Sequence, residues 1–362
     1  MSATRYVTLD GNFRMKEGVL ARPTIAFETW GTPSAAADNA VLVFTGLSPS
    51  AHAASSPDDR RTGWWEDMIG PGKPIDTDRC FVICVNSLGS CFGSTGPASV
   101  NPDTGEPYRL SFPVLHVEDI ANGGAAVLDH LGINRLHTVL GASMGGMTAL
   151  AFAMLHPGRV QRLVSISSAA RSLPFSIAIR SLQREIIRRD PDWNGGNYGP
   201  GGGPVTGMRL ARKLGMISYR SAYEWAERFG RERATDRGDS GDGFGLDFEV
   251  ESYLEAHARK FVGAFDANCY LYLSRAMDLF DVADHGGSLE EGLAEVQLER
   301  ALVVGVESDF LFPIEQQQEL ARGLGQRVGD ISFHRLPSIQ GHDSFLVDMD
   351  RFRPVVARFF RA

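Results

Sequence analysis

The chain alternates short apolar runs with longer segments in which apolar residues recur every three or four positions. The apolar runs are nearly continuous, as expected of strands in a parallel sheet that is covered on both faces. The longer segments have the period of a helix, at 117–131, 147–155 and 315–324. Strands and helices that alternate in this way predict an α/β fold with a mostly parallel central sheet. The predicted strands are 24–30, 40–46, 80–85, 136–140, 163–166, 302–306 and 331–336.

The alternation stops after Ser168 and resumes near Ala301. The stretch between them is rich in Arg, Tyr and acidic residues, with helical patterns at 177–189 and 250–265 and glycine-dense loops at 194–207 and 238–245. Neither loop follows a strand and opens a helix with the spacing of a phosphate-binding loop, so we interpret both as flexible connections. We therefore predict an α/β core from residues 1–171 and 299–362 and an inserted helical lid from residues 172–298.

A serine stands between one predicted strand and the helix that follows it. Residues 141–145 read Gly-Ala-Ser-Met-Gly, which matches the pattern Gly-x-Ser-x-Gly. The two glycines have no Cβ, so strand and helix can pass close together in a tight turn that exposes the hydroxyl of Ser143. A serine hydroxyl is a weak nucleophile, and it needs a base and an acid that orients the base. Ser143 is therefore the predicted nucleophile of an acyl-transfer reaction, if the chain supplies both.

The later sequence offers an acid and a histidine in the order found in α/β-hydrolase enzymes. Asp309 follows the predicted strand 302–306, and His342 follows the last predicted strand. Glu307 is a rival acid, but Asp309 is nearer the loop. His342 would take the proton from Ser143, and Asp309 would fix the tautomer of His342 and stabilise its imidazolium form.

Acyl transfer also needs two backbone N–H groups that point to where negative charge develops. One donor is expected from Met144, the residue after the nucleophile. The other is expected from the loop after an earlier strand, and Leu47 is the predicted donor because it directly follows the strand-ending Gly46.

Composition excludes several classes of protein. The net charge of −8 over 362 residues and the lack of a dense Lys/Arg run argue against a nucleic-acid binder. No apolar run approaches the roughly 20 residues that span a membrane, and residues 1–16 lack the apolar region of a secretory signal. Four irregularly spaced cysteines suit neither a disulfide framework nor a metal site. We expect a cytoplasmic protein without a metal. The cysteines are Cys80, Cys84, Cys91 and Cys269.

The chain carries distinctive motifs at 63–65, 70–79, 86–97, 101–105, 141–147 and 216–221. Together these motifs resemble the homoserine O-acyltransferase family. They span residues 20 to 350, so the resemblance covers nearly the whole sequence. It implies an α/β-hydrolase core with a helical lid, usually in a homodimer. It also implies ping-pong transfer of an acyl group from acyl-CoA to Ser143 and then to an amino-acid hydroxyl, with acyl-CoA as a substrate and no cofactor.

The same resemblance implies that an arginine and an aspartate hold the amino acid, and these positions fall on Arg212 and Asp343. Physical chemistry agrees, because a zwitterion needs a cation for its carboxylate and an anion for its ammonium group. Arginine offers a two-pronged donor for carboxylate. The alternative is that Arg212 forms an ordinary salt bridge in the lid and Asp343 caps a loop.

One departure from the family concerns the acceptor. Acetyl-transferring members typically read Leu-Thr-Gly-Asp-(Ser/Ala)-His in the loop that carries the oxyanion donor. Here the loop reads Leu47-Ser48-Pro49-Ser50-Ala51-His52, so proline replaces the glycine and serine replaces the aspartate. Proline stiffens the loop, and the serine removes a negative charge. The change makes L-serine the nearest candidate acceptor and resembles the serine O-succinyltransferase branch of the family.

A second departure concerns the acyl group. Arg180, Arg184 and Arg188 share one face of the predicted helix 177–189. Arg180 stands where acetyl-type members carry a small polar residue or histidine. A succinyl group ends in a carboxylate that an acetyl group lacks, so an arginine that faces the acyl tunnel could select it. The alternative is a solvated basic face that meets the phosphates of CoA.

These observations predict a succinyl-CoA:L-serine O-succinyltransferase that serves cysteine biosynthesis, with small molecules as its substrates. Homoserine as acceptor, with succinyl-CoA or acetyl-CoA as donor, stays open because one methylene changes binding by only about 1–3 kcal/mol. A serine esterase that uses the same triad is the alternative from another class. A non-catalytic binding protein of this fold is the third reading, and the complete triad disfavours it.

Overall fold

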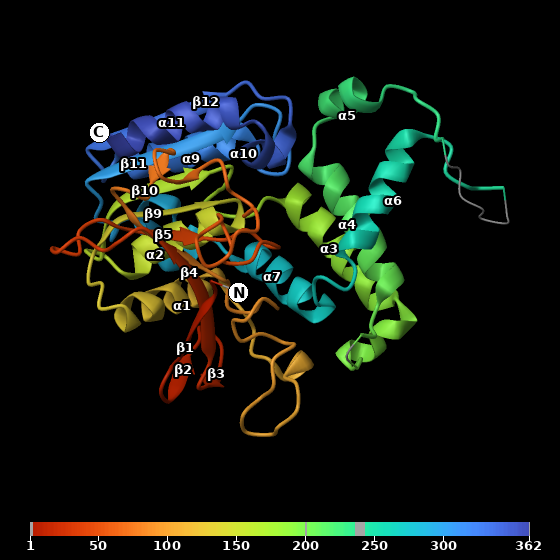
Figure 1. Ribbon diagram of the computed structural model, residues 1–362, viewed down its shortest axis with the longest axis horizontal. Coiled ribbons are helices and arrows are strands. Elements are labelled where there is room, and N and C mark those ends of the chain that lie inside the picture. The colour runs from red at the N-terminus through yellow and green to blue at the C-terminus, as the bar shows by residue number, and fades with distance from the viewer. Residues whose placement is uncertain (1–2, 200, 236–242, 362) are drawn as a thin grey trace.

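An eight-stranded sheet forms the centre of the molecule (Figure 1). The structure is a computed structural model that describes residues 3–199, 201–235 and 243–361. Most of the predicted loop at 238–245 lies outside these residues. The strands, in spatial order, are β1 (Arg5–Thr8), β4 (Thr24–Trp30), β8 (Phe81–Val85), β5 (Ala40–Phe44), β9 (Leu136–Ala142), β10 (Val160–Ile166), β11 (Arg300–Val306) and β12 (Asp330–Leu336).

The sheet is mostly parallel, as the apolar runs predict. Strands β8, β5, β9, β10, β11 and β12 run parallel, whereas β4 is antiparallel to β8 and to β1. Each predicted strand is present, with ends that differ by a few residues. The strands that the pattern missed are short and lack a continuous apolar run: β1, β2 (Asn12–Arg14), β3 (Val19–Ala21), β6 (Ile69–Gly70) and β7 (Ile75–Asp76).

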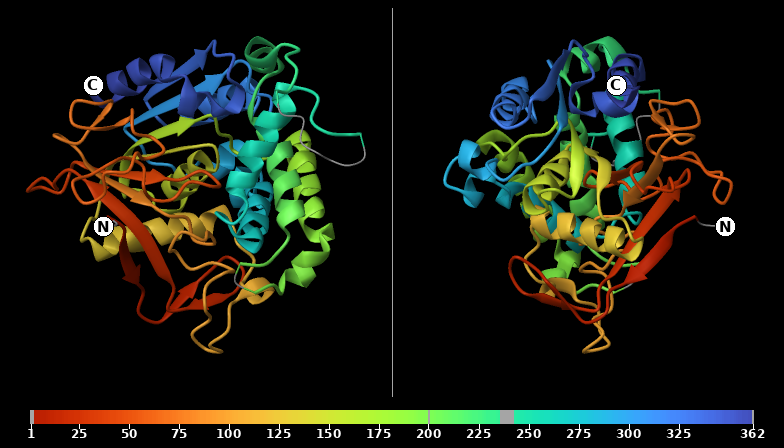
Figure 2. Two further views of the ribbon diagram at one scale, coloured as in Figure 1. Left: turned by 45° about the vertical axis from the view of Figure 1, so that its right-hand side comes forward. Right: turned by 90° about the vertical axis from the view of Figure 1, so that its left-hand side faces the viewer.

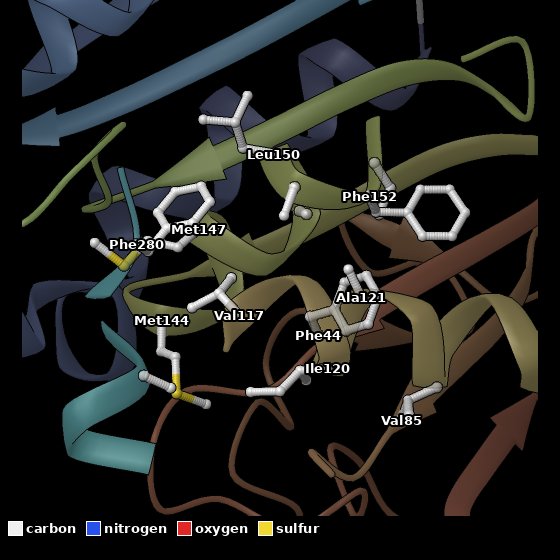
Figure 3. Packing of buried hydrophobic residues seen from close by; sticks show 14 of the residues in the cluster. Phe44, Val85, Val117, Ile120, Ala121, Met144, Met147, Leu150, Phe152 and Phe280 are labelled. Carbon is white, nitrogen blue, oxygen red and sulfur yellow. The ribbon is translucent and has the colours of Figure 1, made fainter. Parts of the chain in front are cut away.

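The central strands are apolar throughout because successive side chains enter two different cores. In β5, Leu42 and Phe44 belong to a cluster with residues of α1 (Val117–His130), α2 (Met144–Leu155) and α9 (Ile314–Gly325). Val41 and Val43 belong to a cluster on the other face, with residues of α11 (Met349–Arg361). Figure 3 shows the first cluster, in which Phe44 of β5 lies beside Ala121 and Ile120 of α1, and Phe280 lies beside Met147 of α2.

The predicted lid corresponds to an insertion between β10 and β11. Its helices are α3 (Pro174–Arg189), α4 (Val205–Tyr219), α5 (Ala222–Phe229), α6 (Glu249–Phe261), α7 (Ala267–Leu279) and α8 (Leu289–Gly292). Figures 1 and 2 show α3 to α6 gathered beside the core, while α7 lies closer to the sheet. The periodicity missed α4, in which Gly207 and Gly215 interrupt the pattern. The end of the insertion packs on the core, since Leu289 and Leu293 lie against Gly323 of α9.

Among the described residues, no helix is long and apolar enough to cross a membrane. The described chain also contains no group of three or more His, Cys, Asp or Glu side chains arranged to hold a metal ion.

Candidate active site

The turn from β9 into α2 places Ser143 in a strained conformation. Its φ of 56° and ψ of −124° are rare for a residue with a side chain, and such strain costs on the order of 1–3 kcal/mol. Hydrogen bonds on both sides hold it. The N–H of Ser143 donates to the carbonyl of Ile166 over 3.0 Å, and the carbonyl of Ser143 accepts from the N–H of Gly146 and the hydroxyl of Ser168. The strained residue is the predicted nucleophile, with its side chain turned out of the helix.

The two glycines of the turn are required by close backbone contacts. A Cβ on Gly141 would lie 2.1 Å from the carbonyl carbon of Gly145. A Cβ on Gly145 would lie 2.2 Å from the carbonyl oxygen of Phe44, at the end of β5. Atoms cannot approach so closely, so any side chain at either position would push β9, α2 and β5 apart.

Ser143, His342 and Asp309 form a continuous chain of hydrogen bonds. Nε2 of His342 lies 2.8 Å from Oγ of Ser143, and Nδ1 of His342 lies 2.7 Å from Oδ2 of Asp309. Because a carboxylate can only accept, Nδ1 carries the ring proton, and Nε2 is left to accept a proton from Ser143. This is the arrangement of a nucleophile, a base and an orienting acid.

The three side chains come from the same edge of the sheet. Ser143 follows β9, Asp309 follows β11 and His342 follows β12, and these strands are parallel. The Asp309 carboxylate is fixed further, since its Oδ1 accepts the backbone N–H groups of Leu311 and Phe312 over 3.0 and 2.9 Å.

The surroundings of His342 are aromatic, and the rival acid is elsewhere. The ring of Phe312 stacks on His342 at 5.1 Å, and Phe345 meets its edge at 5.8 Å. Glu307 instead pairs with Arg335 over 2.7 Å at the surface. Of the two acids, only Asp309 contacts His342 among the described residues.

The electrostatics of the site favour a basic His342. Burial alone would lower the pKa of His342, but the charge of Asp309 and the hydrogen bond to it raise that pKa above its ordinary value. The charge of Asp343 acts in the same direction. His342 is therefore neutral, and able to accept a proton, only when the pH lies above this raised pKa.

The predicted oxyanion donors are both free to donate. Neither the N–H of Leu47 nor that of Met144 has an acceptor among the described residues. Met144 is the first residue of α2, so its N–H belongs to the positive end of the helix. Leu47 lines the same cavity as Ser143.

This cavity lies between the loops of the core and the helices of the insertion. Of the four residues predicted to choose the acceptor, Ser48 and Pro49 line it. Ser50 and Ala51 are not among its lining residues: the Ser50 carbonyl accepts the indole N–H of Trp64 over 2.9 Å, and Ala51 is buried. The sequence interpretation missed lining residues on both sides of the cavity, namely Trp64, Gln183, Ser218, Tyr219 and Tyr270.

The two residues expected to hold the amino acid differ in their position relative to the cavity. Asp343 lines the cavity, and its Oδ2 lies 3.5 Å from Nε of Arg220, a residue that the sequence interpretation missed. Burial raises the pKa of Asp343, and the charges of Arg220, His342 and Arg212 oppose that rise. Arg212 does not line the cavity; its guanidinium stacks over Phe261 at 4.5 Å, and its buried Nε has no hydrogen-bond partner among the described residues.

Arg180 is buried and faces the cavity. It is only 4% exposed, so it does not belong to a solvated basic face. Its Nε donates to Oδ1 of Asp278 over 2.6 Å, and its Nη2 donates to Ser172 over 2.6 Å. Nη1 has no partner among the described residues. Arg184 contacts the other oxygen of Asp278 at 2.7 Å, whereas Arg188 is exposed over the ring of Trp193.

Known proteins resemble this chain over its whole length. A family model described as the alpha/beta hydrolase fold matches residues 39–348. The serine O-succinyltransferase of Litchfieldella anticariensis is 59% identical and that of Stenotrophomonas maltophilia strain K279a is 58% identical, each match covering 99% of this chain and 98% of the relative.

Two solved structures show the same arrangement of the backbone. The homoserine O-acetyltransferase from Bacillus anthracis superposes with a TM-score of 0.88 at 28% identity, covering 100% of this chain and 99% of that one. Esterase E22 also superposes with a TM-score of 0.88, at 30% identity, covering 98% and 99% of the two chains.

The contact at Gly145 predicts that Gly145→Ala destabilises the fold by more than about 2 kcal/mol, because overpacking against backbone leaves no flexible atom to yield. Urea unfolding followed by circular dichroism measures the change. Gly329→Ala is the control, since a Cβ there meets no atom within 4 Å. Equal unfolding midpoints for the two variants would contradict the prediction.

The geometry also predicts how Asp309→Asn changes the pH dependence of p-nitrophenyl acetate hydrolysis. The rate should fall by about 10³- to 10⁴-fold, because the wrong tautomer of His342 is favoured. The pH at which activity rises should also fall, because the charge that raises the pKa of His342 is gone. Glu307→Gln, at the surface pair with Arg335, should change neither quantity; a comparable loss in that variant would refute the assignment of the acid.

Proposed function

The chain belongs to the alpha/beta hydrolase fold family and, within it, to the serine O-succinyltransferase branch of the homoserine O-acyltransferases, and from this premise we propose that it transfers the succinyl group of succinyl-CoA to the hydroxyl of L-serine. It is an O-acyltransferase, and the proposed product would serve cysteine biosynthesis in the cytoplasm. Acyl-CoA is a substrate of this reaction, and no cofactor or metal takes part.

In the first half of the reaction, Oγ of Ser143 attacks the thioester carbonyl while Nε2 of His342 takes the hydroxyl proton. Negative charge develops on the carbonyl oxygen, and we propose that the N–H groups of Leu47 and Met144, which have no acceptor among the described residues, stabilise it. The carbon–sulfur bond then breaks, and CoA leaves as the thiol with the proton from His342. The succinyl group remains as an ester on Ser143.

In the second half, the hydroxyl of the amino acid attacks this ester. His342 takes the hydroxyl proton and returns it to Oγ of Ser143 as the bond to the enzyme breaks. The product is the O-succinyl ester, and Ser143 is regenerated. CoA leaves before the acceptor attacks the ester on Ser143, and this covalent intermediate is the basis of the proposed ping-pong order.

The observation that carries the proposed donor is Nη1 of Arg180, which is buried and has no hydrogen-bond partner in the described part of the chain. Arg180 and Arg184 share the single carboxylate of Asp278, so this cluster of three side chains carries a net positive charge. A buried charge without a partner is costly. The terminal carboxylate of a succinyl group would pair with Nη1 and neutralise the cluster, whereas an acetyl group brings no charge.

The proposed acceptor rests on the cavity wall and on Asp343. Asp343 offers an anion for the ammonium group of an amino acid, and its contact with Arg220 is long enough to be exchanged. Arg212 supplies positive charge beside Tyr219 and Asp343, both of which line the cavity. Pro49 replaces a glycine of the acetyl-transferring pattern in the wall, so its ring occupies space that the longer homoserine would use.

The proposed enzyme is a homodimer, as the family resemblance implies. Helices α3 and α4 of the insertion expose apolar side chains, including Leu182, Leu210 and Ile217. A second copy of the chain would remove this apolar surface from water.

Ester hydrolysis is the second candidate, because esterase E22 has the same backbone arrangement. The same triad serves both reactions, and only the molecule that attacks the acyl-enzyme differs. Buried side chains around Ser143, among them Tyr270 and Met277, limit the access of water and favour transfer.

A two-by-two assay tests donor and acceptor together. Purified protein should release CoA thiol fastest with succinyl-CoA and L-serine, compared with homoserine and with acetyl-CoA. We expect the preference for serine over homoserine to be about 10- to 100-fold, the size expected for one methylene. Release of CoA that is unchanged by either amino acid would identify a hydrolase, and faster turnover of homoserine would overturn the proposed acceptor.

Arg180→Met should lower kcat/KM for succinyl-CoA by about 10- to 100-fold, the value of one charge-assisted hydrogen bond. Turnover of acetyl-CoA should change little, because an acetyl group has no carboxylate that could pair with the guanidinium. Arg188→Met is the matched control, since Arg188 belongs to the same helix but is exposed. Equal losses in the two variants would favour a general interaction with CoA phosphates over selection of the succinyl carboxylate.

A further inference from the structure

We infer that His52 is a positioning residue, which acts as an imidazolium cation to hold the loop that carries the oxyanion donor Leu47 and the cavity wall of Ser48 and Pro49. The meaning of this inference for catalysis rests on the proposed chemistry at Ser143. The charge state of His52 stands on its own contacts, so it can be tested separately.

Both ring nitrogens of His52 face groups that can only accept a hydrogen bond. Nδ1 lies 2.9 Å from Oε2 of Glu28, and Nε2 lies 2.9 Å from the backbone carbonyl oxygen of Arg61. The other oxygen of Glu28 accepts a hydrogen bond from the hydroxyl of Thr4 over 2.8 Å. A neutral imidazole has one N–H, so it would set a lone pair against one of these acceptors. Only the doubly protonated ring satisfies both.

The groups around His52 favour this charge. Glu28 on β4 is 1% exposed, and Asp59 on the loop after His52 is also buried. Burial opposes the cation, but the hydrogen bonds to Glu28 and to the carbonyl of Arg61, with the charges of Glu28 and Asp59, raise the pKa of His52 above its ordinary value. The guanidinium of Arg61 is paired with Asp59. The thiol of Cys84 on β8 stays neutral near Glu28, because burial raises its pKa.

Few other hydrogen bonds hold the segment from Leu47 to His52. None of the backbone N–H groups between Leu47 and Ala51 donates to another described residue. Trp64 instead holds the C-terminal end of the segment: its indole N–H donates to the carbonyl of Ser50, and its backbone N–H donates to the carbonyl of His52. Trp64 itself lines the cavity. The ion pair of His52 and Glu28 therefore fixes both the oxyanion donor and one wall of the acceptor site to the central sheet.

The direction of the pH effect follows from the raised pKa. A cation favoured by the fold stabilises the loop at low pH, and the stabilisation is lost as the pH rises through the folded pKa of His52. Acylation of Ser143 should therefore decline on the alkaline side, while His342 governs the acidic side.

Nitrogen NMR of protein labelled with ¹⁵N-histidine tests the charge state directly, with His52→Gln to identify the signals. Both ring nitrogens of His52 should carry protons at pH 7.5. A neutral ring with a single N–H at that pH would overturn the inference. This result does not depend on the identity of donor or acceptor, so it separates the inference from the proposed function.

The positioning role is tested by the burst of p-nitrophenol when Ser143 is acylated by p-nitrophenyl acetate. In His52→Gln the acylation rate constant should fall by about 10- to 100-fold with a nearly unchanged KM, and the alkaline decline should disappear. In Glu28→Gln that decline should move to lower pH. His285→Gln, which removes a similar contact between His285 and Glu118, is the control and should behave as wild type.

Circular dichroism melting should show both histidine variants folded at the assay temperature. Acylation in His52→Gln that matches His285→Gln, or an alkaline decline that stays in place in Glu28→Gln, would overturn the positioning role. If the variants show the expected acylation rates and pH dependence but the wild-type protein does not transfer succinyl groups to serine, only the proposed function is refuted.

Discussion

The close approach of three backbone segments around Ser143 is the constraint on which the site depends. The end of β5, the end of β9 and the start of α2 come so near one another that only glycine fits at Gly141 and Gly145. The same crowding holds Ser143 at a positive φ, where its side chain leaves the helix, and the N–H of its neighbour Met144 has no acceptor among the described residues. The predicted nucleophile and the predicted oxyanion donor are thus products of one local geometry, and Figure 3 shows the buried side chains near Met144.

Around this turn, the site also depends on buried acidic side chains that lie against histidines or arginines. Asp309 accepts a hydrogen bond from His342 and would balance the imidazolium that forms when His342 takes a proton, and Glu28 balances the inferred charge of His52. The cluster of Arg180, Arg184 and Asp278 differs, because it has two cations and one anion. A protein interior tolerates paired charges far better than unpaired ones. The two balanced pairs hold parts of the enzyme in place, whereas the unbalanced cluster is suited to receive a negatively charged part of a substrate.

Residues with a strong local signature could be predicted from sequence. Ser143 was found because a strand, two glycines and a helix surround it, and the structure brings His342 and Asp309 to it as their chain order predicts. Arg220 could not be found in this way. Arg220 lies in the motif at 216–221, between α4 and α5, but the motif does not show that its partner is Asp343, which lies in a loop of the core. Trp64 and Tyr219 lie within the family motifs, so those motifs were the signal that could have indicated them.

The sequence by itself determined the order of the long apolar strands and of the core helices between them, the turn at Ser143 and the order of the catalytic candidates, because these depend on residues that are neighbours in the chain. Hydrophobic periodicity and glycine spacing are local properties, and they can be read without knowing what packs against them. The tertiary structure decided which arginine is buried with a free donor, which side chains line the cavity and that both nitrogens of His52 face acceptors. Each of these depends on partners that are distant in the chain, since a side chain's charge and exposure are set by whatever the fold places beside it.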